Sequence, residues 1–292
     1  MLARLAVALL WCLHWLPLWL LAPLGQAAGL AFYAIGRARR RVVMINLRLC
    51  FPELDERARG QLARAHFRAA GRAALEHVIL FWGSRGRILK LVRIEGLEHW
   101  QAVRNEPVIW LCPHFIGLDM GGSRIIAEFG GASMYSKQKS EVFDRLILHG
   151  RTRFGNSTLL SRQDGVRGIA RALKQRIPFY YLPDMDFGSR DAVFVPFFGV
   201  PAATITGLSR LAQLGKAKVV PAITRQLPGA QGYVLQFYPA WENFPTADLA
   251  ADARRLNAFI EDRVRELPGQ YYWLHRRFKT RPPGEAVSPY DA

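Results

Sequence analysis

The stretch Val108-Ile-Trp-Leu-Cys-Pro-His114-Phe-Ile-Gly-Leu-Asp119 joins an apolar segment to a turn and the start of a helical pattern. Val108 to Cys112 has the composition of a buried strand, and Ile116 to Phe129 that of the helix that follows it. Pro113 disfavours helical backbone at the residue before it, so the turn lies between the two elements. The stretch therefore predicts a strand-turn-helix unit, the building block of an α/β sandwich.

Strand-like and helix-like segments continue to alternate along the chain. Only the turn Leu227-Pro-Gly-Ala230 separates the last two predicted strands, so they form a hairpin and the sheet is mixed. We expect an α/β domain over residues 37–292, with a mixed sheet flanked by helices. The other predicted elements are a long helix from Asp55, a strand at Ser133–Tyr135, helices at Glu141–Phe154 and Val166–Arg176, a strand at Ile177–Leu182, a segment at Thr204–Leu214, strands at Lys218–Thr224 and Tyr233–Tyr238, and a helix near Asp248–Glu266.

The N-terminus is apolar, because no Asp, Glu, Lys or Arg occurs from Leu5 to Gly36. Leu2 to Leu24 is long enough for a spanning helix, which needs about 20 apolar residues. The arginines that follow, Arg37 and Arg39 to Arg41, favour the cytoplasmic side of a membrane and anionic headgroups. The sequence predicts an N-terminal membrane anchor over residues 1–36, with the rest of the chain facing the cytoplasm.

Two alternatives remain open for this segment. A cleaved signal peptide would have an apolar region of only about 7–15 residues, whereas this one runs on past Pro17 and Pro23, so we expect it to be retained. The two prolines and Gly25 could break the segment into two shorter helices. The anchor can therefore either span the membrane or lie in its interface.

The charge balance indicates a polyanionic partner. The 292 residues contain 40 Lys and Arg against 23 Asp and Glu, a formal net charge of +17. A basic, non-enzymatic protein that binds nucleic acid or tethers to a membrane is one candidate class, but no zinc-finger, helix-turn-helix or RNA-recognition pattern occurs, so nucleic acid is not the expected partner. The three cysteines are far apart, which argues against a disulfide framework or a zinc knuckle. We expect no metal and no cofactor.

The spacing of His114 and Asp119 indicates general-base chemistry. On one continuous helix, residues five apart point about 140° away from each other and do not meet. With His114 in the turn and Asp119 in the first helical turns, the carboxylate can reach back to one imidazole nitrogen and fix the tautomer. The other nitrogen can then take a proton from a substrate hydroxyl. A histidine that only satisfies a helix start, with Asp119 solvated, is the alternative for such a short motif.

Several stretches together resemble the lysophospholipid-acyltransferase-like lipid A biosynthesis acyltransferases, the lauroyl and myristoyl transferases of lipopolysaccharide synthesis. The resemblance covers nearly the whole chain. It is carried by Asn46-Leu-Arg-Leu-Cys-Phe-Pro52, Glu76 before Phe81-Trp82, His114 to Asp119, His149-Gly-Arg-Thr-Arg-Phe154, Pro183-Asp-Met-Asp-Phe-Gly188, Val193-Phe-Val-Pro-Phe-Phe-Gly199 and Tyr271-Tyr-Trp-Leu-His-Arg-Arg-Phe-Lys-Thr-Arg-Pro282.

The resemblance implies a glycerolipid-acyltransferase-like fold and a reaction. It implies that His114 is the catalytic base, that Asp119 supports it, and that Arg151 and Asp184 are also needed. It further implies acyl carrier protein as the acyl donor, an anionic glycolipid as the acceptor, and a location at the cell inner membrane with the catalytic domain facing the cytoplasm. Asp119 stands where this family commonly has Glu, and Met185 where a His is frequent. A glycerolipid or lysophospholipid acyltransferase with the same His/Asp pair is therefore the alternative.

Further charged residues are candidates for substrate binding. Arg151 and Arg153 lie near the end of a predicted helix, where capping and phosphate binding are both plausible uses of a cation. Asp184 and Asp186 follow a predicted strand, at the position where α/β proteins place functional groups. A divalent metal on these two acids is the lesser alternative, because no third ligand is evident. The aromatic and cationic residues of 271–279 suit a headgroup layer.

Overall fold

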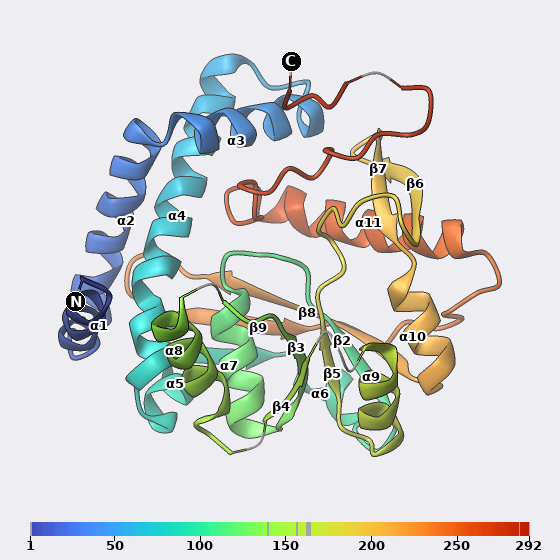
Figure 1. The fold of residues 1–292 in the computed structure, drawn as a ribbon, viewed down its shortest axis with the longest axis horizontal. Coiled ribbons are helices and arrows are strands. Elements are labelled where there is room, and N and C mark those ends of the chain that lie inside the picture. Colours follow the sequence, from blue (N-terminus) through green and yellow to red (C-terminus); the bar gives the residue numbers. More distant parts are fainter. Residues whose placement is uncertain (1, 139, 156, 162–164, 286, 292) are drawn as a thin grey trace.

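A mixed sheet forms the centre of the computed structural model, which describes residues 2–138, 140–155, 157–161, 165–285 and 287–291 (Figure 1). Its strand order is β1-β9-β8-β2-β5-β3-β4. Neighbouring strands run parallel except β8 and β9, which form the predicted hairpin, so the mixed sheet is confirmed. The strands are β1 (Val92–Glu95), β2 (Val108–Leu111), β3 (Gly131–Tyr135), β4 (Ser157–Ser161), β5 (Phe179–Tyr181), β8 (Lys218–Gln226) and β9 (Tyr233–Phe237).

Strand β2 is buried on both faces, as its unbroken apolar sequence predicts. Val108 and Trp110 face one hydrophobic cluster, and Ile109 and Leu111 face the other. This alternation follows from the period of two along a strand. The sheet is therefore a middle layer between two layers of helices, with a core on each side.

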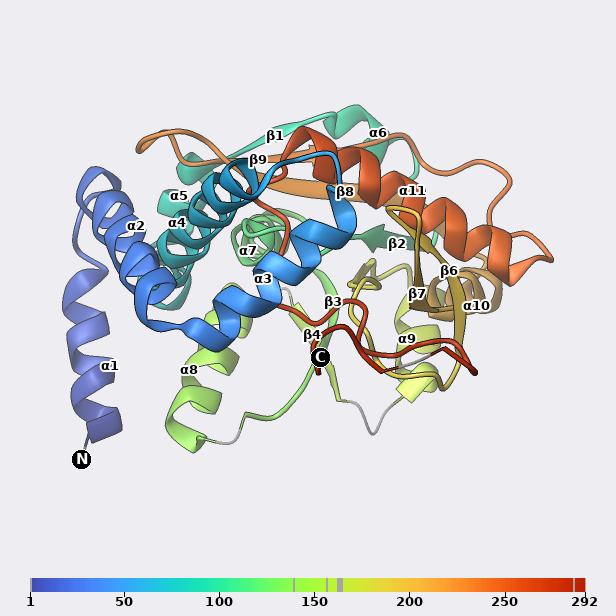
Figure 2. The ribbon, with the colours of Figure 1, turned by 90° about the horizontal axis from the view of Figure 1, so that it is seen from above.

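The helices divide between those two layers (Figures 1 and 2). The first cluster includes side chains from α5 (Arg85–Leu91), α6 (Leu97–Gln101) and α7 (Leu118–Glu128). The second includes side chains from α9 (Gly165–Lys174), α10 (Gly207–Gly215) and α11 (Leu249–Glu266). Helix α8 (Glu141–Thr152) contacts α4 (Glu56–Trp82), which begins where predicted: Asp55 accepts a hydrogen bond from Ala58 N and caps the helix.

Some short strands do not appear among the predicted elements. β6 (Ala192–Phe197) and β7 (Val200–Ile205) form a separate two-stranded antiparallel sheet. The expected segment Thr204–Leu214 therefore contains the end of β7 and most of α10. Pro196 argues against a strand from sequence, but it pairs with Pro201 in a ribbon of only two strands. Strands β1 and β4 are edge strands of four and five residues, too short for a clear periodic signal.

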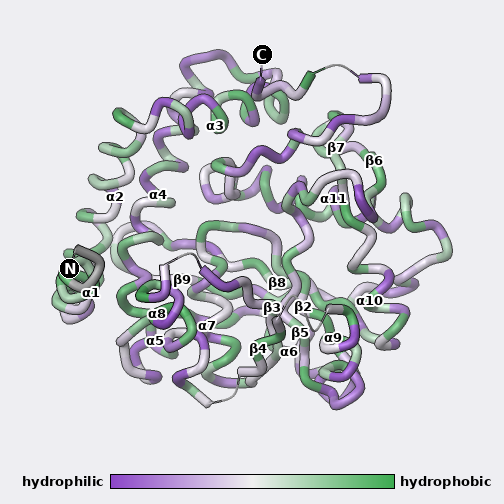
Figure 3. The backbone as a smooth tube through the Cα atoms, in the orientation of Figure 1, coloured by the Kyte–Doolittle hydropathy of each residue, from purple (hydrophilic) through white to green (hydrophobic). Residues whose placement is uncertain are grey.

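The apolar N-terminus forms two helices, α1 (Leu2–Leu13) and α2 (Leu18–Ile35), with a break before Pro17. Figure 3 shows their apolar character beside the more polar α3 (Arg37–Cys50). Within the described residues, α2 is the one helix long and apolar enough to cross a membrane. The guanidinium of Arg87 donates to the carbonyls of His14 and Leu16, so an arginine of α5 holds the break between the two helices.

Helix α2 lies against α4 with its backbone in close approach (Figures 1 and 2). A Cβ on Gly25 would lie 2.6 Å from the Cα of Arg72, and a Cβ on Gly71 would collide with Gly25 and Gly29. Small residues on both helices thus allow contact between the two backbones. Because α4 also carries residues of the site described below, the N-terminal helices are packed against the unit that forms this site.

Candidate active site

His114 contacts Asp184 at the carboxyl edge of the parallel strands. His114 follows β2 and Asp184 follows β5, which is the neighbour of β2 in the sheet. The His114 Nδ1 atom lies 2.7 Å from Asp184 Oδ1, and the His114 backbone N–H donates to the same carboxylate at 2.9 Å from Oδ2. A carboxylate only accepts, so Nδ1 carries the proton and Nε2 presents its lone pair. Nε2 makes no hydrogen bond to another described residue.

The backbone around His114 is held by the C-terminal segment. Tyr272 N–H donates to His114 O at 2.9 Å, and Ile116 N–H donates to Gln270 O at 2.7 Å. A Cβ at Gly117 would lie 2.7 Å from Thr224 O, so glycine allows the turn to pack closely on β8. The histidine is therefore fixed by strands β2, β5 and β8 together with the segment around Tyr272, which lies 158 residues after His114 in the chain.

Asp119 does not make the contact that the sequence suggested. Its Oδ2 accepts from His77 Nε2 at 2.9 Å, and its Oδ1 lies 3.9 Å from the guanidinium of Arg151. The hydrogen bond to His114 is made instead by Asp184, because β5 lies beside β2 and brings that carboxylate to Nδ1. His77, on α4, was not among the predicted site residues, and no local sequence signal distinguishes it from a histidine of a helix surface.

The carboxylates shift the pKa of His114. Burial alone would lower it, but the charge of Asp184 and its hydrogen bond outweigh burial, and the charge of Asp119 adds to them, so the pKa is raised above its ordinary value of 6.5. Burial likewise acts to raise the pKa of Asp184, yet the contact with His114 lowers it. The pair therefore holds an ionised carboxylate beside a basic imidazole, the arrangement a general base needs.

The two arginines of the predicted substrate site have different surroundings. Arg153 donates to the carbonyls of Leu80, Ile79 and Gly83, so it satisfies the C-terminal end of α4. Of the two uses that the sequence left open for this residue, capping is the one that the contacts support. Arg151 is partly exposed and makes only long contacts, at 3.5 Å to Met134 O and 3.9 Å to Asp119.

Asp186 is buried and holds two segments of the chain together. Its carboxylate accepts from Gly188 N, Thr280 N and Thr280 Oγ1, at 2.7 to 2.9 Å. Its own backbone N–H donates to His275 Nε2 at 2.7 Å. These contacts tie the loop after β5 to the C-terminal segment, and the role of Asp186 in substrate binding stays a prediction.

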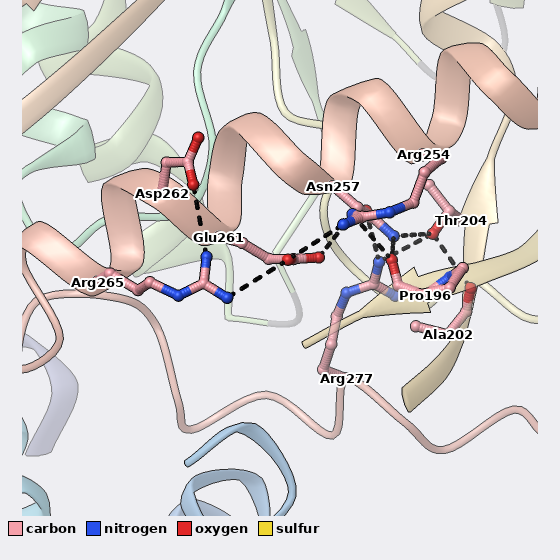
Figure 4. Close-up of polar contacts among 9 residues, drawn as sticks. All are labelled: Pro196, Ala202, Thr204, Arg254, Asn257, Glu261, Asp262, Arg265 and Arg277. Atoms are coloured by element: carbon pink, nitrogen blue, oxygen red, sulfur yellow. Dashed lines mark hydrogen bonds and ion pairs between the residues drawn. The ribbon is translucent and has the colours of Figure 1, made fainter. Parts of the chain in front are cut away.

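Buried residues of the C-terminal motif with cations and aromatics are also structural, and Figure 4 shows one of them, Arg277, beside Thr204 and Asn257. The side chain of Arg277 is 2% exposed and donates to Ala203 O at 2.7 Å and Thr204 Oγ1 at 3.0 Å. Asn257 of α11 donates to Pro196 O and Thr204 Oγ1. Trp273 and Phe278 are fully buried. The expected contact of this motif with a headgroup layer is therefore wrong for these residues, which join α11 to the β6–β7 ribbon.

A cavity of about 210 Å³ opens beside Asp119. His77, Asp119 and Arg151 contribute its charged groups. Most of its lining is apolar and comes from α4, α7, α8 and the adjoining strands, including Leu80, Phe81, Ile126, Ile147, Phe154 and Leu159. A concave apolar pocket with a few charged groups is the usual form of a small-molecule site.

The described residues contain no group of three or more His, Cys, Asp or Glu side chains that could hold a metal. Asp184 and Asp186 are held by different partners, His114 and Thr280 respectively. The metal alternative for these two acids therefore has no support in their contacts.

Sequence comparison identifies the family of this chain. The profile of the bacterial lipid A biosynthesis acyltransferases matches residues 1–280. The chain belongs to this family. It is 34% identical to the lipid A biosynthesis lauroyltransferase of Escherichia coli K12 over 284 residues, which is 96% of this chain and 92% of the relative. It is also 34% identical to the myristoyltransferase of the same organism, over 93% of this chain and 83% of the relative.

A third relative agrees with membership in the lipid A family. A lipid A biosynthesis acyltransferase of Haemophilus influenzae is 32% identical over 94% of this chain and 89% of its own length. The solved structure of the 1-acyl-sn-glycerophosphate acyltransferase from Thermotoga maritima matches 79% of this chain and 97% of its own chain. The TM-score is 0.40 and the sequence identity 13%, so this similarity does not bear on the reaction. As a member of this family, the chain is an acyltransferase. The alternative of a basic, non-enzymatic protein is therefore wrong.

Proposed function

We propose that this acyltransferase moves a fatty acyl chain from an acyl carrier protein thioester to a hydroxyl of a phosphorylated lipid A precursor, with His114 as the general base. The observation that carries the proposal is the 2.7 Å contact between His114 Nδ1 and Asp184, which leaves Nε2 available to a substrate. Mass spectrometry of lipid A and phospholipids, from cells with and without the protein, tests it. Loss of one acyl chain from lipid A, with phospholipids unchanged, is the expected result.

The proposed reaction needs one proton carrier. His114 Nε2 removes the proton of the acceptor hydroxyl as that oxygen attacks the thioester carbonyl carbon. The C–S bond of the tetrahedral intermediate then breaks, and the leaving thiolate takes the proton from the imidazolium. Asp184 holds Nδ1–H throughout and stabilises the positive charge on the ring. No serine or cysteine is assigned as a nucleophile, so the acyl group passes directly to the acceptor.

The cavity and Arg151 suit the two substrates. The apolar lining from α4, α7 and α8 matches a hydrocarbon chain, and burial of each methylene contributes about 0.8 kcal/mol. Arg151 borders the same cavity, is partly exposed and makes no close ion pair. A guanidinium can bind a phosphate through two parallel hydrogen bonds. We therefore assign the acyl chain to the cavity and the acceptor phosphate to Arg151.

Replacing Arg151 with Lys should raise the KM for the phosphorylated acceptor by about tenfold, because a point charge replaces a planar fork. Arg145→Lys is the matched control: it makes the same exchange on the same helix, where the side chain is 75% exposed. Initial rates at varied acceptor concentration, with saturating acyl carrier protein thioester, measure the effect. Equal activity of the unmodified enzyme on a dephosphorylated acceptor would contradict the assignment.

We further propose that α1 and α2 are retained and lie on the inner membrane, with the catalytic unit on the cytoplasmic side. Trp15, in the break between the two helices, and Trp19 of α2 are 70% and 64% exposed, and Leu5, Leu9 and Trp11 of α1 are exposed as well. Arg87 donates hydrogen bonds to the break between α1 and α2, and glycines allow close contact between α2 and α4. Both contacts support an anchor that packs against the domain and does not project from it. Arg37 and its neighbours follow directly and suit anionic headgroups.

The double variant Trp15→Ser, Trp19→Ser should bind anionic vesicles at least about tenfold more weakly, since it removes two large apolar side chains from the exposed surface. The control, Leu214→Ser with Val287→Ser, changes two exposed apolar residues elsewhere and should bind as the unmodified protein does. Vesicle flotation measures binding, and N-terminal sequencing tests retention. A mature protein that begins after residue 25, or that is fully released by physiological salt, would contradict this proposal.

A further inference from the structure

Both ring nitrogens of His77 face atoms that only accept hydrogen bonds. His77 Nδ1 lies 2.6 Å from the carbonyl oxygen of Ala73, one turn earlier in α4, and Nε2 lies 2.9 Å from Asp119 Oδ2. A carbonyl oxygen has no proton to give, so Nδ1 must carry one. If Asp119 is ionised, Nε2 must carry one as well. An imidazole with two N–H groups is the imidazolium cation.

The surroundings of the pair favour an ionised Asp119. Arg151 of α8 lies 3.9 Å from Asp119 Oδ1, and a cation there disfavours protonation of the carboxylate. Desolvation acts to raise the pKa of Asp119, but His77, then Arg151 and His114, lower it to about 2. Burial acts to lower the pKa of His77, but the hydrogen bond and charge of Asp119 and the carbonyl of Ala73 outweigh it, against an opposing effect of Arg151. The pKa of His77 is thus raised above 6.5.

The charged groups near His77 come from three helices. Asp119 faces it from α7, and Arg151 lies beyond that carboxylate on α8. Glu76, the neighbour of His77 on α4, is already engaged by Arg72 and Tyr233. Asp119 therefore lies between His77 and Arg151 at the edge of the cavity. Its carboxylate is closer to His77 Nε2, at 2.9 Å, than to the guanidinium of Arg151, at 3.9 Å.

We propose that protonated His77 is a positioning residue, which holds Asp119 and thereby keeps Arg151 available for the phosphate of the acceptor. This inference rests on the function proposed above. A neutral His77 that still donated to Ala73 would turn a lone pair toward the Asp119 carboxylate. The two groups would separate, and Asp119 would pair closely with Arg151 instead. The guanidinium would then be withdrawn from the substrate, so binding of the acceptor depends on the charge of His77.

The sign of the pH dependence follows from the raised pKa of His77. The imidazolium is present below that pKa and is lost as the pH rises through it. The KM for the phosphorylated acceptor should therefore increase on the alkaline side. His114 has the opposite pH dependence, because it must be neutral to accept a proton. As the pH decreases through its raised pKa, His114 becomes protonated and kcat falls. The two histidines thus affect different kinetic constants on opposite sides of the profile.

Two variants of His77 separate its charge from its hydrogen bond. His77→Gln can still donate to Asp119 but cannot be charged, so the alkaline rise in KM should disappear. His77→Phe can do neither, and the KM for the phosphorylated acceptor should be raised roughly tenfold to a hundredfold at every pH, as expected for loss of a hydrogen bond to a charged group. His99→Gln, on the exposed side of α6, is the matched control and should keep the profile of the unmodified enzyme.

A second measurement needs no turnover. In full-length protein with 15N-labelled histidine in detergent micelles, the His77 signals, assigned by their absence in His77→Gln, should show two protonated ring nitrogens at pH 7. A neutral tautomer at pH 7 would overturn the proposal, as would an alkaline rise in KM that persists in His77→Gln. If the unmodified enzyme showed no preference for a phosphorylated acceptor, the proposed function would fail, while the NMR result would still decide the charge of His77.

Discussion

A His114→Ala variant should retain the fold and lose most general-base catalysis, so that turnover falls by about 10²–10⁴-fold. The side chain is 19% exposed and its hydrogen bond goes to a single carboxylate, so its removal leaves the packed layers on either side of the sheet intact. Turnover is measured with saturating acyl carrier protein thioester and a phosphorylated lipid A precursor. The KM values should change little, because the lost interaction belongs to proton transfer.

The control for this prediction is a measurement that shows that the His114→Ala variant is folded. A thermal melt in detergent should give a Tm close to that of the unmodified enzyme. Removal of the imidazole takes one donor away from the buried Asp184, which keeps the His114 backbone N–H, so a modest decrease is acceptable. A variant that is well folded and has near-normal turnover would disprove the assignment of His114 as the base.

An Asp184→Asn variant should be impaired almost as severely, by about 10²–10⁴-fold in kcat, because the orienting carboxylate of such a pair selects the tautomer. Asp184 accepts from both Nδ1 and the backbone N–H of His114. An amide can offer only one acceptor oxygen, and its NH₂ group would face a donor. The ring would then carry its proton on Nε2, where it cannot act as a base.

Asp119→Asn provides the comparison that separates the two carboxylates. Its described contacts go to His77 and Arg151, and it affects His114 only through its charge. We expect a smaller loss in kcat than for Asp184→Asn, together with an increased KM for the phosphorylated acceptor. Asp119→Glu should keep partial activity, since it retains the charge. Equal losses of kcat in Asp119→Asn and Asp184→Asn would show that both carboxylates support the base directly.

The local patterns of the sequence were sufficient for the fold class. The buried strand at 108–112, the helix after it, the cap at Asp55 and the final hairpin all appear in the structure close to their predicted positions. Each depends on interactions between residues close in sequence, or on a periodicity that decides which side of an element is buried. The β6–β7 ribbon was missed because a proline in a short strand contradicts the usual pattern.

The partners of the site residues could not be read from the same patterns. His114 and Asp119 are five residues apart, yet His114 bonds to Asp184, 70 positions away, and Asp119 bonds to His77, 42 positions away. Arg153 and Asp186 are likewise occupied by carbonyls of α4 and by Thr280. In each case the deciding contact joins elements that are distant in the chain.

The sequence by itself therefore determined the strand-turn-helix that presents His114, the family, and the apolar N-terminal segment. Only the tertiary structure decided which carboxylate serves the histidine and which charged residues are free to meet a substrate. The physical reason is that hydrogen bonds depend on distances of about 3 Å between atoms. Those distances are set by the order of strands in the sheet, where β5 lies beside β2, and by the packing of α4 against α7 and α8. Neither leaves a periodic signal in the residues themselves.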